Sequence, residues 1–182
     1  MKKYAGLFLM MILLNVTTVL AGVEISSANF PNAAFRSLVS EFDLDKDGFL
    51  IPDEFEAVKE IDCNKNTKIT NLKGVEIFTN LTSLSCLQCP IGKLDVSKNI
   101  KLEYLDCCEC KLSALDVTAN PNIKQLWCYG NSIKTLDLHN CKYLVKAANK
   151  GVYNNDKNDG KACSYADKDN SAYLVVDKNI IL

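Results

Sequence analysis

The central part of the chain carries an apolar pattern that repeats every 21 residues. Three copies, at residues 81–91, 102–112 and 123–133, read L-x-x-L-x-C-x-x-[N/C]-x-L, with isoleucine in place of some leucines. A related half-repeat, typically with Leu-Asp-Val in place of Leu-x-Cys, follows each copy, at residues 91–99, 112–120 and 133–141. Within each copy the apolar residues alternate with other residues at a period of two. This is the spacing of a short β-strand with one buried face.

Repeats of this length have to stack. One coil of 21 residues cannot enclose its own apolar side, so consecutive coils share a continuous core. The asparagine or cysteine that follows each strand turns the chain and satisfies buried backbone groups. We predict about four coils between roughly Val58 and Val152, the last of them a degraded copy at residues 144–152.

The repeat resembles the leucine-rich-repeat consensus L-x-x-L-x-L-x-x-[N/C]-x-L, which six half-repeats follow. The version with cysteine in one strand and Leu-Asp-Val in the other is similar to leucine-rich-repeat proteins that bacteria export. The resemblance covers roughly Ala28 to the C-terminus. It implies a leucine-rich-repeat solenoid of the α/β class, mainly β, with a protein-binding or adhesion-like role at the cell surface.

An acidic loop at residues 43–54 precedes the repeats and matches the EF-hand pattern over its whole length. Three carboxylates alternate along it, a glycine at the sixth position permits the sharp turn, and a glutamate closes it. Calcium prefers a shell of oxygen ligands of this kind. The expected ligands are the side chains of Asp43, Asp45, Asp47 and Glu54 and the backbone carbonyl of Phe49.

The sequence around this loop predicts a helix on each side. Phe35, Leu38, Val39 and Phe42 have the spacing of an amphipathic helix, and Pro52 suits the first turn of a second helix. We find no second EF-hand pattern, although such loops usually occur in pairs. We therefore expect residues 23–60 to form a helix–loop–helix cap over the first coil, with a calcium ion of structural rather than signalling function.

The N-terminus has the order of a secretory signal peptide. Lys2 and Lys3 precede an apolar run at residues 7–14, and the small residues Ala21 and Gly22 follow. We predict a signal peptide at residues 1–22 and an exported product, secreted, periplasmic or at the cell surface. Val23 stands where a lipoprotein carries its lipidated cysteine, so no lipid anchor is expected after cleavage.

The C-terminal part differs from the repeats. Residues 153–182 begin with a stretch rich in asparagine, aspartate, lysine and glycine and then turn apolar. We predict that they form a β cap on the solenoid at residues 61–152, because an open sheet edge invites aggregation.

The chain has nine cysteines, for which three interpretations stay open. Cys86, Cys89, Cys107 and Cys110 fit a zinc-ribbon spacing and suggest a thiolate metal site. A disulfide between Cys89 and Cys110 is a second interpretation. Reduced thiols in the core are the third, and they explain why asparagine also occurs at the second cysteine position. We expect Cys108 to point outward and to react with thiol reagents.

Charge and motifs exclude several functions. A formal net charge of -1 gives no reason to expect nucleic acid or an anionic membrane as a partner. We find no motif for nucleophilic, phosphate-binding or zinc-protease chemistry, and the single histidine, His139, falls on a predicted solvated face. We do not expect an enzyme.

Stacked repeats would align their outward residues into columns. Tyr104, Trp127 and Tyr129 would then cluster on one sheet, where aromatic residues commonly anchor interfaces. The sequence thus predicts a scaffold that binds a protein or a surface glycan. The alternatives are a thiolate metal-binding protein and a structural exported protein with no specific ligand. Asp95, Asp116 and Asp137 would form a ladder on the other side, which we interpret as repeat chemistry rather than a second metal site.

Overall fold

The structure is a computed structural model that describes residues 22–149, 153–155, 160–166, 171–177 and 180–182. The predicted signal peptide lies outside the described residues, apart from Gly22. No helix in the described ranges has both the length and the apolar character needed to cross a membrane.

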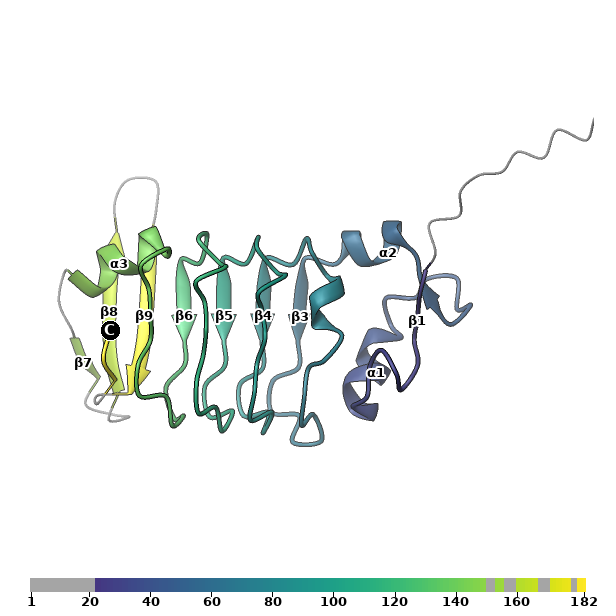
Figure 1. Ribbon diagram of the computed structural model, residues 1–182, viewed down its shortest axis with the longest axis horizontal. Coiled ribbons are helices and arrows are strands. Elements are labelled where there is room, and N and C mark those ends of the chain that lie inside the picture. Colours follow the sequence, from purple (N-terminus) through teal and green to yellow (C-terminus); the bar gives the residue numbers. More distant parts are fainter. Residues whose placement is uncertain (1–21, 150–152, 156–159, 167–170, 178–179) are drawn as a thin grey trace, which may run out of the picture.

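The chain forms a mainly-β solenoid, which confirms the predicted repeat architecture (Figure 1). Each copy contributes one short strand. These are β3 (Glu60–Asp62), β4 (Ser83–Ser85), β5 (Tyr104–Asp106) and β6 (Gln125–Trp127). They pair in parallel without a slip, so that Ile61, Leu84, Leu105 and Leu126 lie side by side.

The core follows from this register, because equivalent residues stack over one another. Leu84, Leu105 and Leu126 are fully buried, and the half-repeats close the opposite side of the core with residues such as Val96 and Val117. These return segments are not assigned as strands; a 3₁₀ helix, η1 (Val75–Ile77), lies in the first of them.

The N-terminal cap has two short helices, α1 (Ala33–Val39) and α2 (Pro52–Ala57), around the acidic loop. Asn32 begins α1 by accepting a hydrogen bond from the Phe35 amide at 2.8 Å. The Asn32 side chain also donates to the Lys68 carbonyl at 3.0 Å, which ties the cap to the first coil.

Apolar contacts hold the cap in the same place. The rings of Phe42 and Phe78 meet edge to face, with 5.6 Å between their centroids. Phe30 covers Gly74, whose φ of +104° puts it in the left-handed region, and a Cβ added at Gly74 would lie 2.2 Å from the Phe30 ring. The cap therefore fits closely over the first coil.

The C-terminal part extends the sheet in an unexpected way. Helix α3 (Lys142–Asn149) occupies most of the segment where the sequence predicts a last degraded coil. Its residues Leu144 and Ala147 are buried, and their spacing of three suits a helix as well as it suits the repeat consensus. The pattern alone does not separate the two, and the helix is what forms.

The next parallel neighbour of β6 comes from further along the chain. β9 (Ser171–Asp177) pairs with it, and β8 (Gly160–Ala166) and β7 (Tyr153–Asn155) follow in antiparallel order. Close to the C-terminus, Ile181 forms a parallel bridge with Thr135 in the last return segment. The sheet thus continues for three strands beyond the repeats.

Candidate functional site: the acidic loop and the parallel sheet face

The structure brings the three predicted aspartate ligands together. Ligand oxygens of Asp43, Asp45 and Asp47 all lie within 4.8 Å of one another, the only such group of three or more potential metal ligands among the described residues. Asp43 is buried, whereas Asp45 and Asp47 are exposed. The loop backbone includes two residues with positive φ angles, Lys46 at 62° and Gly48 at 89°.

Backbone amides inside the loop partly satisfy these carboxylates. Asp43 accepts from the Gly48 amide at 2.9 Å, and Asp47 accepts from the Phe49 amide at 2.8 Å. Burial acts to raise the pKa of Asp43, but the backbone hydrogen bonds, led by that of Gly48, outweigh it and lower the pKa. The pKa of Asp45 is raised: burial and the Asp47 charge outweigh the Asp47 amide hydrogen bond. A cation would relieve this crowding of negative charge.

Glu54, the predicted closing ligand, is buried and faces back into the loop. Its Oε1 accepts from the Leu44 amide at 2.7 Å, and its Oε2 accepts from the Ile51 amide at 3.0 Å. It is not one of the three clustered carboxylates. The side chain of Phe49, whose backbone carbonyl is the fifth predicted ligand, points into solvent and is 42% exposed.

A short strand that precedes α1 pairs with the acidic loop. β1 (Val23–Glu24) pairs antiparallel with β2 (Phe49–Leu50), which is part of the acidic loop itself. The Ile25 amide continues this pairing by donating to the Gly48 carbonyl at 2.8 Å. The sequence analysis did not predict this pairing of the acidic loop with residues just before α1.

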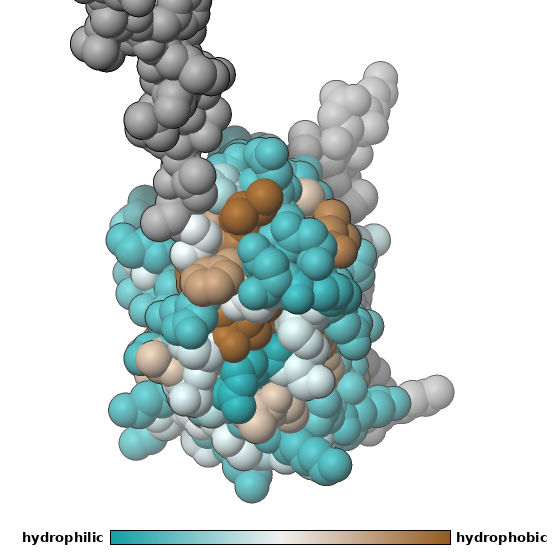
Figure 2. Space-filling view, turned by 90° about the vertical axis from the view of Figure 1, so that its right-hand side faces the viewer, coloured by the Kyte–Doolittle hydropathy of each residue, from teal (hydrophilic) through white to brown (hydrophobic). Residues whose placement is uncertain are grey.

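Figure 2 shows this N-terminal end of the molecule, where hydrophobic residues form small separate patches among hydrophilic ones. The most exposed apolar residue of the loop is Leu44, at 77%.

The second candidate site is the outward face of the parallel strands. Tyr104, Trp127 and Tyr129 all lie half-buried on it, as side chains that alternate with the core residues must. Trp127 lies directly beside Asp106 in the register of β5 and β6. Tyr129 donates from its hydroxyl to Glu109 at 3.1 Å, a hydrogen bond that raises the pKa of the phenol.

β9 adds residues to this face that the sequence analysis did not name. Tyr173 pairs with Gln125 and is 41% exposed, and Val175 pairs with Trp127. Asp177 accepts from the Gly130 amide at 2.8 Å and fixes the turn after β6. The alternation of buried and outward residues at 172–177 was a signal for a strand, but nothing in it indicated parallel pairing with β6.

The cysteines form a buried ladder of free thiols. Cys86, Cys107 and Cys128 follow one another along the core, and the eight cysteines with described side chains are all free. The Cys110 thiol donates to the Cys86 carbonyl at 2.9 Å and lies 3.8 Å from the Cys86 sulfur. The partner of Cys110 is thus Cys86, and no disulfide joins it to Cys89.

The structure also goes against the thiolate metal interpretation and against the expectation for Cys108. Cys86, Cys89, Cys107 and Cys110 do not gather as a group of metal ligands in the described chain, because Cys89 instead donates to the Cys63 carbonyl at 2.9 Å. Cys108 is buried, with 3% of its surface exposed. Burial raises the pKa of the Cys108 thiol, so it is not a reactive surface cysteine.

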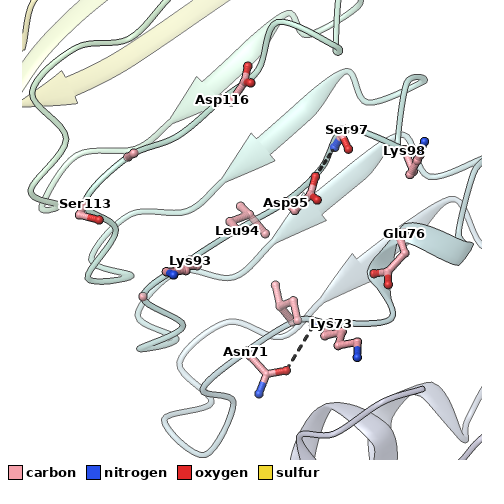
Figure 3. Close-up of a pocket in the computed structure, with 13 residues that line it drawn as sticks. Asn71, Lys73, Glu76, Lys93, Leu94, Asp95, Ser97, Lys98, Ser113 and Asp116 are labelled. Atoms are coloured by element: carbon pink, nitrogen blue, oxygen red, sulfur yellow. Dashed lines mark hydrogen bonds between the residues drawn. The ribbon is translucent and has the colours of Figure 1, made fainter. Parts of the chain in front are cut away.

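A groove of about 640 Å³ lies on the return side of the solenoid, across three coils (Figure 3). Its charged residues are mixed in sign: Lys73, Lys93 and Lys98 face Glu76, Asp95 and Asp116. Asp95 and Asp116 also hold the turns that follow them, because each accepts from the amide two residues later at 2.9 Å. The aspartates of this side therefore have a structural use, as expected for repeat chemistry.

No protein-family model matches this sequence, and no curated protein matches it significantly. Matching solved structures include the functional domain of InlJ from Listeria monocytogenes, described as including a cysteine ladder, with a TM-score of 0.48 and 25% identity. That match covers 68% of this chain and 32% of the InlJ chain.

A second solved structure, an internalin (InlF) from Listeria monocytogenes strain 4b F2365, matches with a TM-score of 0.47 and 14% identity. This second match covers 70% of this chain and 45% of the InlF chain. This chain therefore spans less than half the length of the InlJ chain and of the InlF chain. Both TM-scores lie below 0.5, and the fold described above rests on the strand register of this chain alone.

Proposed function

We propose that this protein is an exported leucine-rich-repeat scaffold that binds a protein or a surface glycan with the outward face of its parallel strands. The observation that carries the proposal is the alignment of Tyr104, Trp127 and Tyr129 on a face that β9 extends with Tyr173. Each of these rings is partly exposed on a rigid strand or the turn that follows it. Rigid, partly exposed aromatic residues are the usual anchors of interfaces.

The experiment is a capture assay on bacterial and host surface extracts with the purified protein and its Trp127→Ala/Tyr129→Ala variant. We expect a specific partner to be retained by the wild type and lost by the variant. Tyr143→Ala is the matched control, because Tyr143 is equally half-buried but lies on α3, off the sheet. Equal retention by all three proteins would contradict the proposal.

We propose further that one calcium ion fixes the cap. Asp43, Asp45 and Asp47 provide a cluster of the right chemistry, and Glu54 would exchange its two amide hydrogen bonds for the ion. The Phe49 carbonyl is the fifth expected ligand. When bound, the ion supplies a positive charge that holds the loop; it has no catalytic part in this proposal.

Thermal unfolding in excess calcium and in chelator tests the calcium site. We expect a higher melting temperature with calcium, because an ion that binds only the folded state stabilises it by mass action. A lone EF-hand loop is expected to bind calcium weakly, as extracellular modules do, with a Kd on the order of 10⁻⁴ M or looser. In the Asp45→Asn variant the difference should shrink, and identical melting curves for the wild type would refute the site.

The thiolate metal function loses its support. Within the described residues the Cys89 thiol donates to the Cys63 carbonyl and the Cys110 thiol to the Cys86 carbonyl, and the four sulfurs do not form one set of metal ligands. Metal content of protein purified without oxygen is the direct measurement, and we expect no stoichiometric zinc.

A further inference from the structure

The outward positions of the strands are acidic as well as aromatic. β3 presents Glu60 and Asp62, and β5 presents Asp106, whereas the outward positions of β4, β6 and the described side chains of β9 contain no lysine or arginine. Asp62 and Asp106 each accept from the amide two residues later, at 2.9 and 3.0 Å, which holds the turn that follows.

Several lysines with described side chains lie near the edges of the face. Lys124 forms a 2.7 Å ion pair with Glu103, so these two charges compensate each other. Lys59 and Lys65 lie just beyond the two ends of β3, and the Lys59 ammonium donates to the Glu56 carbonyl at 2.9 Å. The lysines of the groove, Lys73, Lys93 and Lys98, belong to the return side. The outward strand positions with described side chains thus carry carboxylates and no lysine or arginine.

Two of the aromatic rings on this face have a carboxylate as their immediate neighbour. Trp127 lies opposite Asp106 in the strand register, and the Tyr129 hydroxyl contacts Glu109. Tyr104 is two residues from Asp106 on the same side of β5. A ring beside a carboxylate is suited to a guanidinium group, which stacks on the ring and donates to the carboxylate at once. An ammonium group can do less of this, because it has no flat face.

We propose that the sheet face binds an arginine-rich segment of a protein partner. This inference rests on the proposed function and makes it more specific. Asp106 and Trp127 form the central arginine position, Glu109 and Tyr129 a second one, and Glu60 and Asp62 attract further positive charge at the open edge of the sheet. Complementary charge of this kind also speeds association and makes it dependent on salt.

The test is direct binding of three labelled peptides of equal length, in which glycine alternates with arginine, lysine or glutamate. We expect the arginine peptide to bind best, the lysine peptide more weakly and the glutamate peptide not at all. The Glu60→Gln/Asp62→Asn/Asp106→Asn variant should weaken arginine-peptide binding about tenfold, because it removes several surface charge pairs that each contribute modestly to affinity. These substitutions preserve side-chain size and the turn hydrogen bonds, and a thermal melt verifies folding.

The chain offers a matched control. Asp95→Asn/Asp116→Asn/Asp137→Asn removes the same number of negative charges from the return side, where the carboxylates hold equivalent turns. We expect it to leave binding within about twofold of the wild type, since distant exposed charges are largely screened. Trp127→Ala should abolish the preference for arginine over lysine.

Several outcomes would overturn the inference. Equal weakening by both triple variants would mean that net charge alone attracts the peptides. Equal binding of the arginine and lysine peptides would remove the role of the rings. If the triple sheet variant still captures the partner that Trp127→Ala/Tyr129→Ala loses, the sheet is a binding face but not for arginine, so the proposed function stands and this inference fails.

Discussion

At the scale of single residues, one position shows how two different side chains can do the same work. Asn99 donates to the Val75 and Phe78 carbonyls, and Asn120 donates to those of Val96 and Asn99, at 2.9–3.0 Å. Cys141 occupies the next place in this column, and its thiol lies within hydrogen-bonding distance of the equivalent carbonyls at 3.4 and 3.7 Å. The thiol has one hydrogen to give where the amide has two.

Substitutions at Asn120 test this equivalence. Asn120→Ala should lower the free energy of unfolding by about 1–3 kcal/mol, because two buried carbonyls lose their donor. Asn120→Cys should cost less, since a thiol can still satisfy one of them. Urea unfolding of the three proteins measures the difference, and a cysteine variant as unstable as the alanine variant would contradict the equivalence.

Gly74 tests how closely the cap fits. Gly74→Ala combines a left-handed backbone with a collision against Phe30. We therefore expect the free energy of unfolding to fall by more than the ~1–3 kcal/mol that backbone strain alone would cost. Gly92→Ala is the control, because Gly92 has a φ of +68° but no atom within 4 Å of the added Cβ. Equal melting temperatures for the two variants would mean that Phe30 moves aside at no cost.

At the scale of elements, the sequence predicted most of what has a periodic cause. The strands β3 to β6, the burial of Leu84 and its equivalents, and the helices around the acidic loop all follow from local spacing. The role of β1 did not, because two residues carry no periodicity and their partners lie far along the chain: Glu24 and Phe49, the pair nearest the turn, are 25 positions apart. Cys108 was misjudged because alternation predicts direction but not what covers a turn.

The pairing of β1 with the acidic loop leads to a prediction at this scale. Ile25→Pro removes the amide that donates to Gly48, and it should weaken calcium binding and lower the melting temperature measured in excess calcium. Ile25→Ala keeps the amide and isolates the loss of the side chain. Calcium titration by calorimetry distinguishes them, and equal affinities in both variants would show that the loop does not depend on this strand.

At the scale of the whole molecule, stability should depend on neighbouring coils rather than on one central core. Deleting residues 106–126 removes one period and joins Leu105 to Trp127, which restores the repeat register. We expect this shortened protein to fold, with a lower melting temperature and a smaller urea m-value, because repeat stability is roughly a sum over coils and their interfaces.

A deletion of different length provides the control. Removing residues 106–122 leaves four extra residues between equivalent positions and places polar side chains in the core. Circular dichroism and gel filtration should show that this variant is unfolded or aggregated. Similar behaviour of both deletions would mean that the coils are not the independent units described here.

The buried thiols give this protein an internal set of reporters. Cys63, Cys86, Cys107 and Cys128 lie one per coil, and burial raises the pKa of Cys107 well above its ordinary value and that of Cys128 to about 12. A thiol that is both covered and protonated reacts with an alkylating reagent when its coil opens. Timed alkylation followed by mass spectrometry would therefore read the opening free energy of each coil separately, and would show from which end the solenoid frays.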